Sequence, residues 1–379
     1  MQRHRILAAI ALAVFCGLSA PARAEAPQQV TFLHYWTGHL RGGIDAAAAA
    51  FNRSQDRFRL RATGFEHESF KIGIKVMLES GNPPDLFSYW AGARTQSLVD
   101  AGLLAPLDDA WDAARLDQRF SPQVAAACTY NGHKYAIPLT QHWVGLFYNV
   151  RLFEKLGLAP PADWDSFKAA CRAIKAAGVT PLALGSRDRW PAQFWYDYLL
   201  LRTAGPEWRD KLLAGRASFC SAQSRRAFTL WKELLDAGYF TPDPNRYDWS
   251  EACMMVASGK AAMTLMGTWA GGLYEGQLNL ALGRDFDVFP FPKVDPAAPC
   301  VSLGPIDAVA VPREGNVAAA KAAAVYFSGQ APQEAMSAGS GALAPSGLVP
   351  PDFYRPLQAK VRTLIGGCPR WAFALDPAA

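Results

Sequence analysis

The 379-residue sequence has little charge and little excess of either sign. Asp, Glu, Lys and Arg make up 19% of the chain, and the formal net charge is +5. Removal of an N-terminal segment that contains Arg3, Arg5 and Arg23 leaves a net charge of +2. A dedicated nucleic-acid-binding protein needs a basic face, which this charge does not provide, so no nucleic-acid partner is expected. Hydrophobic residues make up 50% of the chain, which excludes a mainly disordered protein.

Long apolar runs are absent beyond the N-terminus, which excludes an integral membrane protein with several spans. Residues 1–24 combine the basic start Arg3-His4-Arg5, the apolar stretch Ile6–Ala20 and the A-x-A site Ala22-Arg23-Ala24. This order is typical of a cleaved secretory signal peptide. The alternative is a membrane anchor, for which the apolar run is short. We therefore predict that residues 1–24 are a signal peptide and that the mature chain is exported to a bacterial periplasm.

Cysteine is sparse, and no C-x-x-C occurs. Six cysteines follow the predicted cleavage site: Cys128, Cys171, Cys220, Cys253, Cys300 and Cys368. In an oxidising compartment they permit one to three disulfides, whose connectivity the sequence does not define. Cys171 falls with Phe167, Ala170 and Ile174 on one apolar helix face, so it is interpreted as a small buried hydrophobic residue.

Familiar enzyme motifs are also missing: the chain has no G-x-S-x-G, H-E-x-x-H, P-loop or S-x-x-K. All five histidines of the mature chain precede residue 143, and no two have metal-ligand spacing. The carboxylate pairs Asp108/Asp109 and Glu66/Glu68 are interpreted as a helix cap and a solvated face. We therefore expect no catalytic residue, no metal and no cofactor.

Strand and helix signals alternate over residues 28–109. Strands are expected at Val30–Trp36, Phe58–Ala62 and Asp85–Trp90, and helices at Ile44–Asn52, Ser69–Glu79 and Thr95–Ala101. The middle of the chain is richer in helix, with segments starting at Trp164, Phe194, Ser224 and Trp249. Short strands return at Ala261–Met266, Phe286–Phe289 and Ala308–Val311. The pattern predicts an α/β protein with crossover units and a mostly parallel sheet.

Aromatic residues gather at predicted strand ends and loops. They are Tyr35, Trp36, Tyr89, Trp90, Trp143, Trp190, Trp269 and Trp371, with polar neighbours such as Thr37, His39, Gln141, His142, Arg187, Asp188 and Asp307. A flat aromatic ring buries the C–H face of a sugar, and polar groups bond its hydroxyl rim, so this mixture favours a saccharide ligand. Five other tryptophans lie at helix starts or on apolar helix faces and are assigned to the core: Trp111, Trp164, Trp208, Trp231 and Trp249.

Six segments, taken in order and spacing, resemble one protein family. They are His34–Gly38, Gly81–Phe87, Gly102–Asp108, Gly132–Pro138, Phe147–Asn149 with Leu156–Leu158 and Trp164, and Gly259–Trp269. The chain resembles the extracellular solute-binding proteins of bacterial carbohydrate ABC importers, the family that includes maltose-binding protein, over essentially its whole mature length.

The resemblance implies a type II periplasmic binding protein fold, with two discontinuous α/β lobes joined by a hinge and the ligand between them. The first lobe would comprise residues 25–138 plus 302–342, and the second 143–299 plus 347–379. The hinge crossings would lie at 139–142, 299–301 and 343–346.

The resemblance also implies a ligand-binding set, transferred by position. It consists of Trp36, Thr37, Gly38, His39, Tyr89, Trp90, Gln141, His142, Arg187, Asp188, Trp269, Gly271, Asp307 and Trp371. Tyr89 and Trp90 compete for one stacking position. His142 falls where the maltose relative has a sugar-contacting carboxylate. The predicted site also has fewer aromatic residues and more charge than that of the maltose relative. Together with His142, this difference suggests a short or polar glycoside as ligand.

The implied function is capture of a sugar or small glycoside by hinge closure and its delivery to an inner-membrane ABC permease by a monomeric binding protein. Two alternatives stay open. One is an exported glycoside hydrolase, for which Asp188 and Asp307 would be the carboxylate pair. The other is a sugar-sensing module that reports to a membrane receptor. Arg187 would either bind an anionic sugar or form a salt bridge with Asp188.

Overall fold

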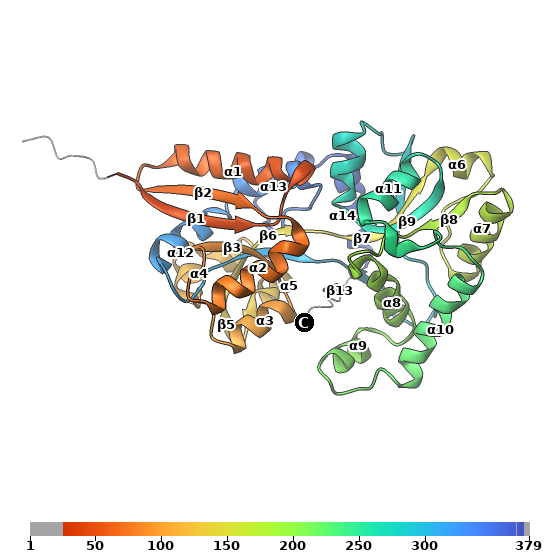
Figure 1. The fold of residues 1–379 in the computed structure, drawn as a ribbon, viewed down its shortest axis with the longest axis horizontal. Coiled ribbons are helices and arrows are strands. Elements are labelled where there is room, and N and C mark those ends of the chain that lie inside the picture. The colour runs from red at the N-terminus through yellow and green to blue at the C-terminus, as the bar shows by residue number, and fades with distance from the viewer. Residues whose placement is uncertain (1–25, 369, 375–379) are drawn as a thin grey trace, which may run out of the picture.

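The computed structural model describes residues 26–368 and 370–374, which form two α/β lobes side by side (Figure 1). The predicted signal peptide, residues 1–24, lies outside the described residues. Within the described part, every helix is too short or too polar to cross a membrane.

The first lobe is built on a five-stranded sheet in the order β2-β1-β3-β12-β6. These strands are β1 (Gln28–His34), β2 (Phe58–Gly64), β3 (Leu86–Trp90), β6 (Ala136–Gln141) and β12 (Ile306–Ala310). The helices of this lobe are α1 (Arg41–Ser54), α2 (His67–Glu79), α3 (Ala93–Asp100), α4 (Asp108–Ala114), α5 (Pro122–Ala127), α12 (Val317–Tyr326) and α13 (Gln330–Ser340). The shorter elements are η1 (Gly38–Leu40), η2 (Leu116–Gln118), β4 (Thr129–Tyr130) and β5 (His133–Lys134).

The prediction of a mostly parallel sheet is only partly right. β1 pairs in parallel with both β2 and β3, as the alternating strands and helices of residues 28–109 predicted. β12, however, pairs antiparallel with both β3 and β6. β12 enters the sheet from a distant part of the chain and not through a crossover helix from β3, so the rule for crossover connections does not fix its direction.

The second lobe contains a four-stranded sheet in the order β10-β7-β9-β8. Its strands are β7 (Val144–Asn149), β8 (Thr180–Ala183), β9 (Ala261–Gly267) and β10 (Phe286–Phe289), and a separate parallel pair joins β11 (Val301–Leu303) to β13 (Arg370–Ala372). Its helices are α6 (Val150–Lys155), α7 (Trp164–Ala176), α8 (Trp190–Thr203), α9 (Pro206–Leu213), α10 (Ala222–Asp236), α11 (Trp249–Ala257) and α14 (Pro356–Gly366). The shorter helices are η3 (Pro244–Arg246), η4 (Gly272–Gln277) and η5 (Pro351–Phe353).

Local sequence explains where two of these helices begin. At α7, the Asp163 carboxylate accepts from the backbone N–H of Ser166, and the Ser166 side chain bonds back to the cap. Asp248 and Glu251 form the same capping box at α11. The apolar face predicted for α7 is confirmed, because Phe167, Ala170, Cys171 and Ile174 are all buried.

Three chain segments pass between the lobes, and backbone hydrogen bonds hold them together. One links β6 to β7, one links β10 to β12, and one links α13 to α14. Gln141 exchanges two backbone hydrogen bonds with Leu343, of 2.9 and 2.8 Å, and the His142 N–H donates to the Pro305 carbonyl at 3.0 Å. The three segments therefore meet at one place between the two lobes.

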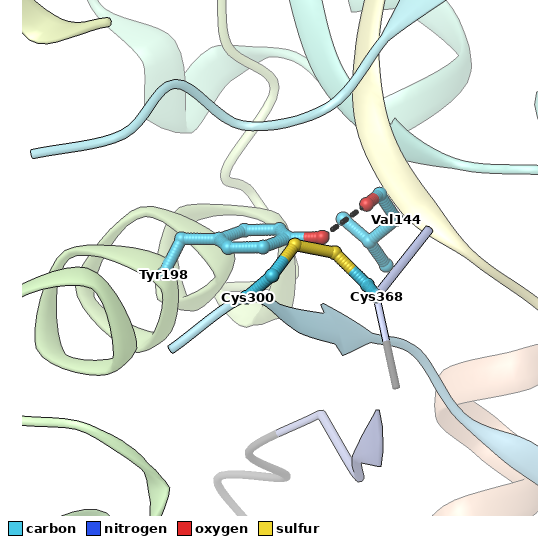
Figure 2. The surroundings of a disulfide bond; sticks show 4 residues. All are labelled: Val144, Tyr198, Cys300 and Cys368. Atoms are coloured by element: carbon cyan, nitrogen blue, oxygen red, sulfur yellow. Dashed lines mark hydrogen bonds between the residues drawn. A yellow bond between two sulfur atoms is a disulfide. The ribbon is translucent and has the colours of Figure 1, made fainter. Parts of the chain in front are cut away.

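One disulfide ties two distant segments of the second lobe. Cys300 and Cys368, 68 positions apart in sequence, have their Cα atoms 5.1 Å apart. Figure 2 shows the bridge beside the ring of Tyr198, whose hydroxyl donates to the Val144 carbonyl. Among the residues that the structure describes, the other four cysteines (Cys128, Cys171, Cys220 and Cys253) are free, and Cys171 is buried as predicted.

Candidate functional site

A cavity of about 620 Å³ lies between the two lobes. This volume is within the range of small-molecule clefts, roughly 300–1,000 Å³. The first lobe contributes the loop after β1, the start of α2 and the end of β3. The second lobe contributes the starts of α8 and α11 and the loop after β9. The lining therefore comes from strand ends and helix starts, where α/β folds place their ligands.

Trp90 forms the aromatic wall on the first lobe. Its indole stacks on the ring of Tyr35, with centroids 4.3 Å apart and planes 11° apart. Two cations also approach this indole: the Lys71 ammonium lies 5.8 Å and the Arg94 guanidinium 5.2 Å from the ring centre. Cations over an indole are attracted by its negative face. One edge of the cavity thus joins an aromatic surface to positive charge.

Trp269 forms the facing wall on the second lobe. A Cβ atom added to Gly267 would lie 1.9 Å from the Trp269 ring, so only glycine allows the indole to fold over its own chain. The ring centroids of Trp190 and Trp269 are 5.7 Å apart, and their planes form an angle of 68°. The ring centroid of Phe194 lies 6.1 Å from that of Trp269. These contacts fix the plane of the Trp269 ring before any ligand arrives.

Aromatic contacts also cross from one lobe to the other. The ring centroids of His39 in the first lobe and Trp249 in the second are 5.7 Å apart. Those of His67 in the first lobe and Trp190 in the second are 6.2 Å apart. All four side chains line the cavity. The described structure therefore has its cleft walls in contact at two places.

Asp307 and His142 are buried polar residues of the cavity lining, and Thr140 lies behind Asp307. The Thr140 hydroxyl donates to the Asp307 carboxylate, and His142 Nε2 lies 3.6 Å from the same oxygen. Burial lowers the pKa of His142 to about 3, so the imidazole is neutral at pH 7 and this contact is not an ion pair. Burial raises the pKa of Asp307 to about 6, although the hydrogen bond from Thr140 opposes that shift.

The raised pKa of Asp307 has a consequence for stability. The folded carboxyl, with a pKa of about 6, binds a proton more readily than the unfolded one, with its ordinary value of 3.8. Its contribution to stability is therefore largest at low pH and is lost as the pH rises through about 6. Between pH 7 and pH 5, the stability of the wild type should improve by about 1 kcal/mol relative to Asp307→Asn.

Thermal unfolding of both proteins at the two pH values measures this change. Titrating groups away from residue 307 cancel, because only the difference between the two proteins is read. His142, with a pKa of about 3, does not titrate between pH 5 and pH 7. A difference in melting temperature that stays constant across this pH range would contradict the buried, proton-binding carboxyl.

A charged cluster occupies the start of α2. Glu66 caps the helix by accepting from the backbone N–H groups of Glu68 and Ser69. Burial raises the pKa of Glu68, but hydrogen bonds from His67 and Lys71 outweigh it and lower that pKa to about 2. Lys71 Nζ lies 2.9 Å from the Glu68 carboxylate. The Glu66/Glu68 pair is thus a cap and an ion-pair partner beside the cavity, and not only the solvated face that we predicted.

The cavity brings together eight of the fourteen residues predicted to bind ligand. They are Trp36, Thr37, Gly38, His39, Trp90, His142, Trp269 and Asp307. Of the two candidates for one stacking position, Trp90 lines the cavity, while Tyr89 is 1% exposed in the first-lobe core. Their roles toward a ligand stay predictions.

The other five predicted residues lie apart from the described lining. Gln141 ends β6 and pairs with Leu343, and Gly271 lies against Leu357 of α14. Trp371 lies on β13, and Asp188 lies in the loop that precedes α8. Arg187 forms ion pairs with Asp248 at 2.8 Å and with Glu251 at 3.6 Å. The salt bridge foreseen for Arg187 therefore exists, but its partners are on α11 and not Asp188.

Several lining residues were not in the predicted set. They include Glu66, His67, Lys71, Arg94, Trp190, Phe194, Arg209, Trp249 and Phe373. The assignment of Trp249 to the core was only partly right, because this first residue of α11 packs against a core cluster of the second lobe and also lines the cavity. Trp111 and Trp164 are buried as predicted, whereas Trp208 and Trp231 are partly buried. For His67 a usable signal was present: α2 starts directly after β2, and such a helix places its first residues at the sheet edge that binds ligands.

Comparison with known proteins identifies the family. The model for bacterial extracellular solute-binding proteins matches residues 45–334, more than half of the chain. A probable sugar-binding periplasmic protein of Mesorhizobium japonicum is 29% identical over 300 residues, which are 77% of this chain and 70% of that protein. An uncharacterized ABC transporter extracellular-binding protein of Pyrococcus horikoshii is 28% identical over 281 residues, 72% of this chain. The match spans 63% of the length of that Pyrococcus relative.

A solved structure extends the likeness to the whole fold. The bacterial solute receptor AcbH, described as having an exclusive preference for β-D-galactopyranose, superposes with a TM-score of 0.82 at 25% identity. The match covers 91% of this chain and 88% of AcbH. This fold is the two-lobed type II periplasmic solute-binding architecture that the sequence predicted. The chain belongs to the bacterial extracellular solute-binding protein family.

Proposed function

We propose that the protein captures a sugar or small glycoside between its lobes and delivers it to an ABC importer. One observation carries this proposal: an inter-lobe cavity with Trp90 on one wall, Trp269 on the other and the buried polar residue Asp307 in its lining. Indole rings bury the apolar faces of a sugar, and the polar groups discriminate among hydroxyl patterns. The sugar-binding relatives and the galactopyranose receptor AcbH support the same ligand class.

Hinge closure is the mechanism that we propose. The lobes would comprise residues 25–138 plus 302–342 and residues 143–299 plus 347–379, with crossings at 139–142, 299–301 and 343–346. Ligand contacts with both lobes stabilise the closed state. A shift from 1:99 to 99:1 in favour of closure needs about 5.5 kcal/mol of differential binding, which stacked rings and matched hydroxyls can supply. No bond of the ligand is broken in this cycle.

The proposed setting is the periplasm, after cleavage of residues 1–24. The partner is an inner-membrane permease that recognises the closed lobes of a monomeric binding protein. Family membership supports this partnership, since the Pyrococcus relative is named an ABC transporter extracellular-binding protein. The alternative of a receptor-linked sugar sensor differs only in the membrane partner. Capture by a purified permease in nanodiscs, and its dependence on sugar, distinguishes the two.

A sugar panel gives the direct test. The mature protein is expected to melt at a higher temperature with one of a set of monosaccharides, disaccharides and acidic sugars. At a sugar concentration 100 times the Kd, the stabilisation is about 2.7 kcal/mol, which corresponds to roughly 4 °C for a chain of this size. Small-angle scattering should show a smaller radius of gyration with the same sugar. A panel that leaves both quantities unchanged would refute sugar capture.

The glycoside hydrolase alternative needs two carboxylates about 5–9 Å apart across the scissile bond. Asp307, one of the nominated pair, lines the cavity as a buried acceptor for Thr140, whereas Asp188 lies outside the described lining. The same panel tests this alternative, because we expect every bound glycoside to be recovered intact. Slow formation of a free sugar would overturn the binding-only proposal.

A further inference from the structure

The C-terminal segment 370–374 lies on the second lobe, and one of its side chains, Phe373, reaches the first lobe. Ala372 is buried in the second-lobe core, and Ala374 packs against that core. Phe373, which lies between them, packs instead against the first-lobe core. Its Cβ is 4.0 Å from the position that a Cβ on Gly92, at the start of α3, would occupy. Both Phe373 and Ala374 line the cavity. The Phe373 side chain therefore crosses one side of the cleft.

The chain just before Phe373 is anchored to the second lobe. Cys368 is bonded to Cys300, and β13 pairs in parallel with β11 from Val301 to Leu303. The N–H of Gly304 adds a hydrogen bond of 3.2 Å to the Ala372 carbonyl. A disulfide next to a strand pair leaves only a short free length of chain before residue 373, so the direction of Phe373 is set by the second lobe.

A buried ion pair holds the main chain of Phe373 itself. Arg209 of α9 is 3% exposed and forms a two-point pair with Asp197 of α8, which is fully buried. Arg209 Nη2 also donates to the Phe373 carbonyl at 2.5 Å. A guanidinium that is already oriented by a carboxylate offers its remaining N–H groups in fixed directions. The carbonyl of Phe373 is thus fixed by a rigid donor.

We propose that Phe373 is a specificity-determining residue that closes this side of the cleft and limits the ligand to a short sugar. The inference rests on the proposed sugar-binding function and names the length class of the ligand. An aromatic side chain held between the lobes occupies the path by which a longer oligosaccharide would leave the cavity. Each further sugar unit would have to displace Phe373 from its contacts with the first lobe.

A chain-length series tests the proposal. Calorimetry with glucose to maltotetraose, and with xylose to xylotetraose, is run on the wild type, on Phe373→Ala and on Phe373→Leu. The matched control Phe353→Ala removes a partly buried phenylalanine outside the cavity lining. The wild type should prefer the shorter members, and Phe373→Ala should raise the affinity for the longest bound member at least tenfold relative to the shortest. Phe373→Leu should give an intermediate ratio, and Phe353→Ala the wild-type ratio.

Two different results separate this inference from the proposed function. If the wild type binds sugar and Phe373→Ala shows the same preference among sugar lengths, the role of Phe373 is overturned and sugar capture stands. If the wild type binds no sugar of either series or of the wider panel, the proposed function fails. Closure by Phe373 is then read from hydrogen exchange in the sugar-free protein. The amides of Gly92–Arg94 should exchange faster in Phe373→Ala, and unchanged rates would overturn the closure.

Discussion

Replacement of Trp269 by alanine is expected to weaken sugar binding at least tenfold while the protein stays folded. Its indole is held in one orientation by Trp190, Phe194 and the bare backbone of Gly267, so a sugar face can dock without reordering the ring. An aromatic side chain buries roughly 150–250 Å², and each tenfold loss of affinity corresponds to about 1.4 kcal/mol. Removal of only part of the contact area between Trp269 and the sugar would account for a tenfold loss of affinity.

Calorimetry with the best sugar of the panel measures the change, and circular dichroism checks the fold. Trp231→Ala is the matched control, because Trp231 of α10 is partly buried in the second lobe but outside the described cavity lining. We expect Trp231→Ala to reduce the melting temperature and to keep the wild-type Kd. Equal affinities in Trp269→Ala and the wild type would remove Trp269 from the binding site.

The fold was predictable because local signals and family resemblance agree. The strands and helices of residues 28–109 follow the expected alternation, and Phe286–Phe289 matches β10 at both ends. The antiparallel entry of β12 was not predictable from periodicity, because strand direction depends on where a distant segment returns to the sheet. Local sequence patterns predict whether a segment is a helix or a strand, whereas strand order and direction depend on pairing between distant segments.

The cavity lining was partly predictable, from aromatic residues at strand ends and from the family resemblance. Trp90, Trp269 and Asp307 were nominated in this way and all three line the cavity, while their contact with a ligand stays a prediction. Trp249 was missed because the first residue of an amphipathic helix looks the same in sequence whether it faces a core or a cleft. Phe373 was missed for another reason: its position depends on a disulfide whose partners the sequence left open.

Loss of the Cys300–Cys368 bridge should lower the stability of the second lobe strongly. The bridge closes a loop with a sequence separation of 68. A loop of this length restricts the unfolded chain by about 4 kcal/mol in the chain-entropy account, so Cys300→Ser/Cys368→Ser should melt roughly 5 °C lower than the wild type. Dithiothreitol should lower the melting temperature of the wild type to the same value and leave the double variant unchanged.

Cys220→Ser provides the control, because Cys220 is a free and exposed thiol of the same lobe. It should melt with the wild type, both with and without reductant. Equal melting temperatures for the double variant and the wild type would show that β11 and β13 hold the segment without the bridge.

The same double variant links stability to specificity, because loss of the bridge frees the chain that orients Phe373. Its preference among sugar lengths should therefore move in the same direction as that of Phe373→Ala, although less far, since Arg209 still holds the Phe373 carbonyl.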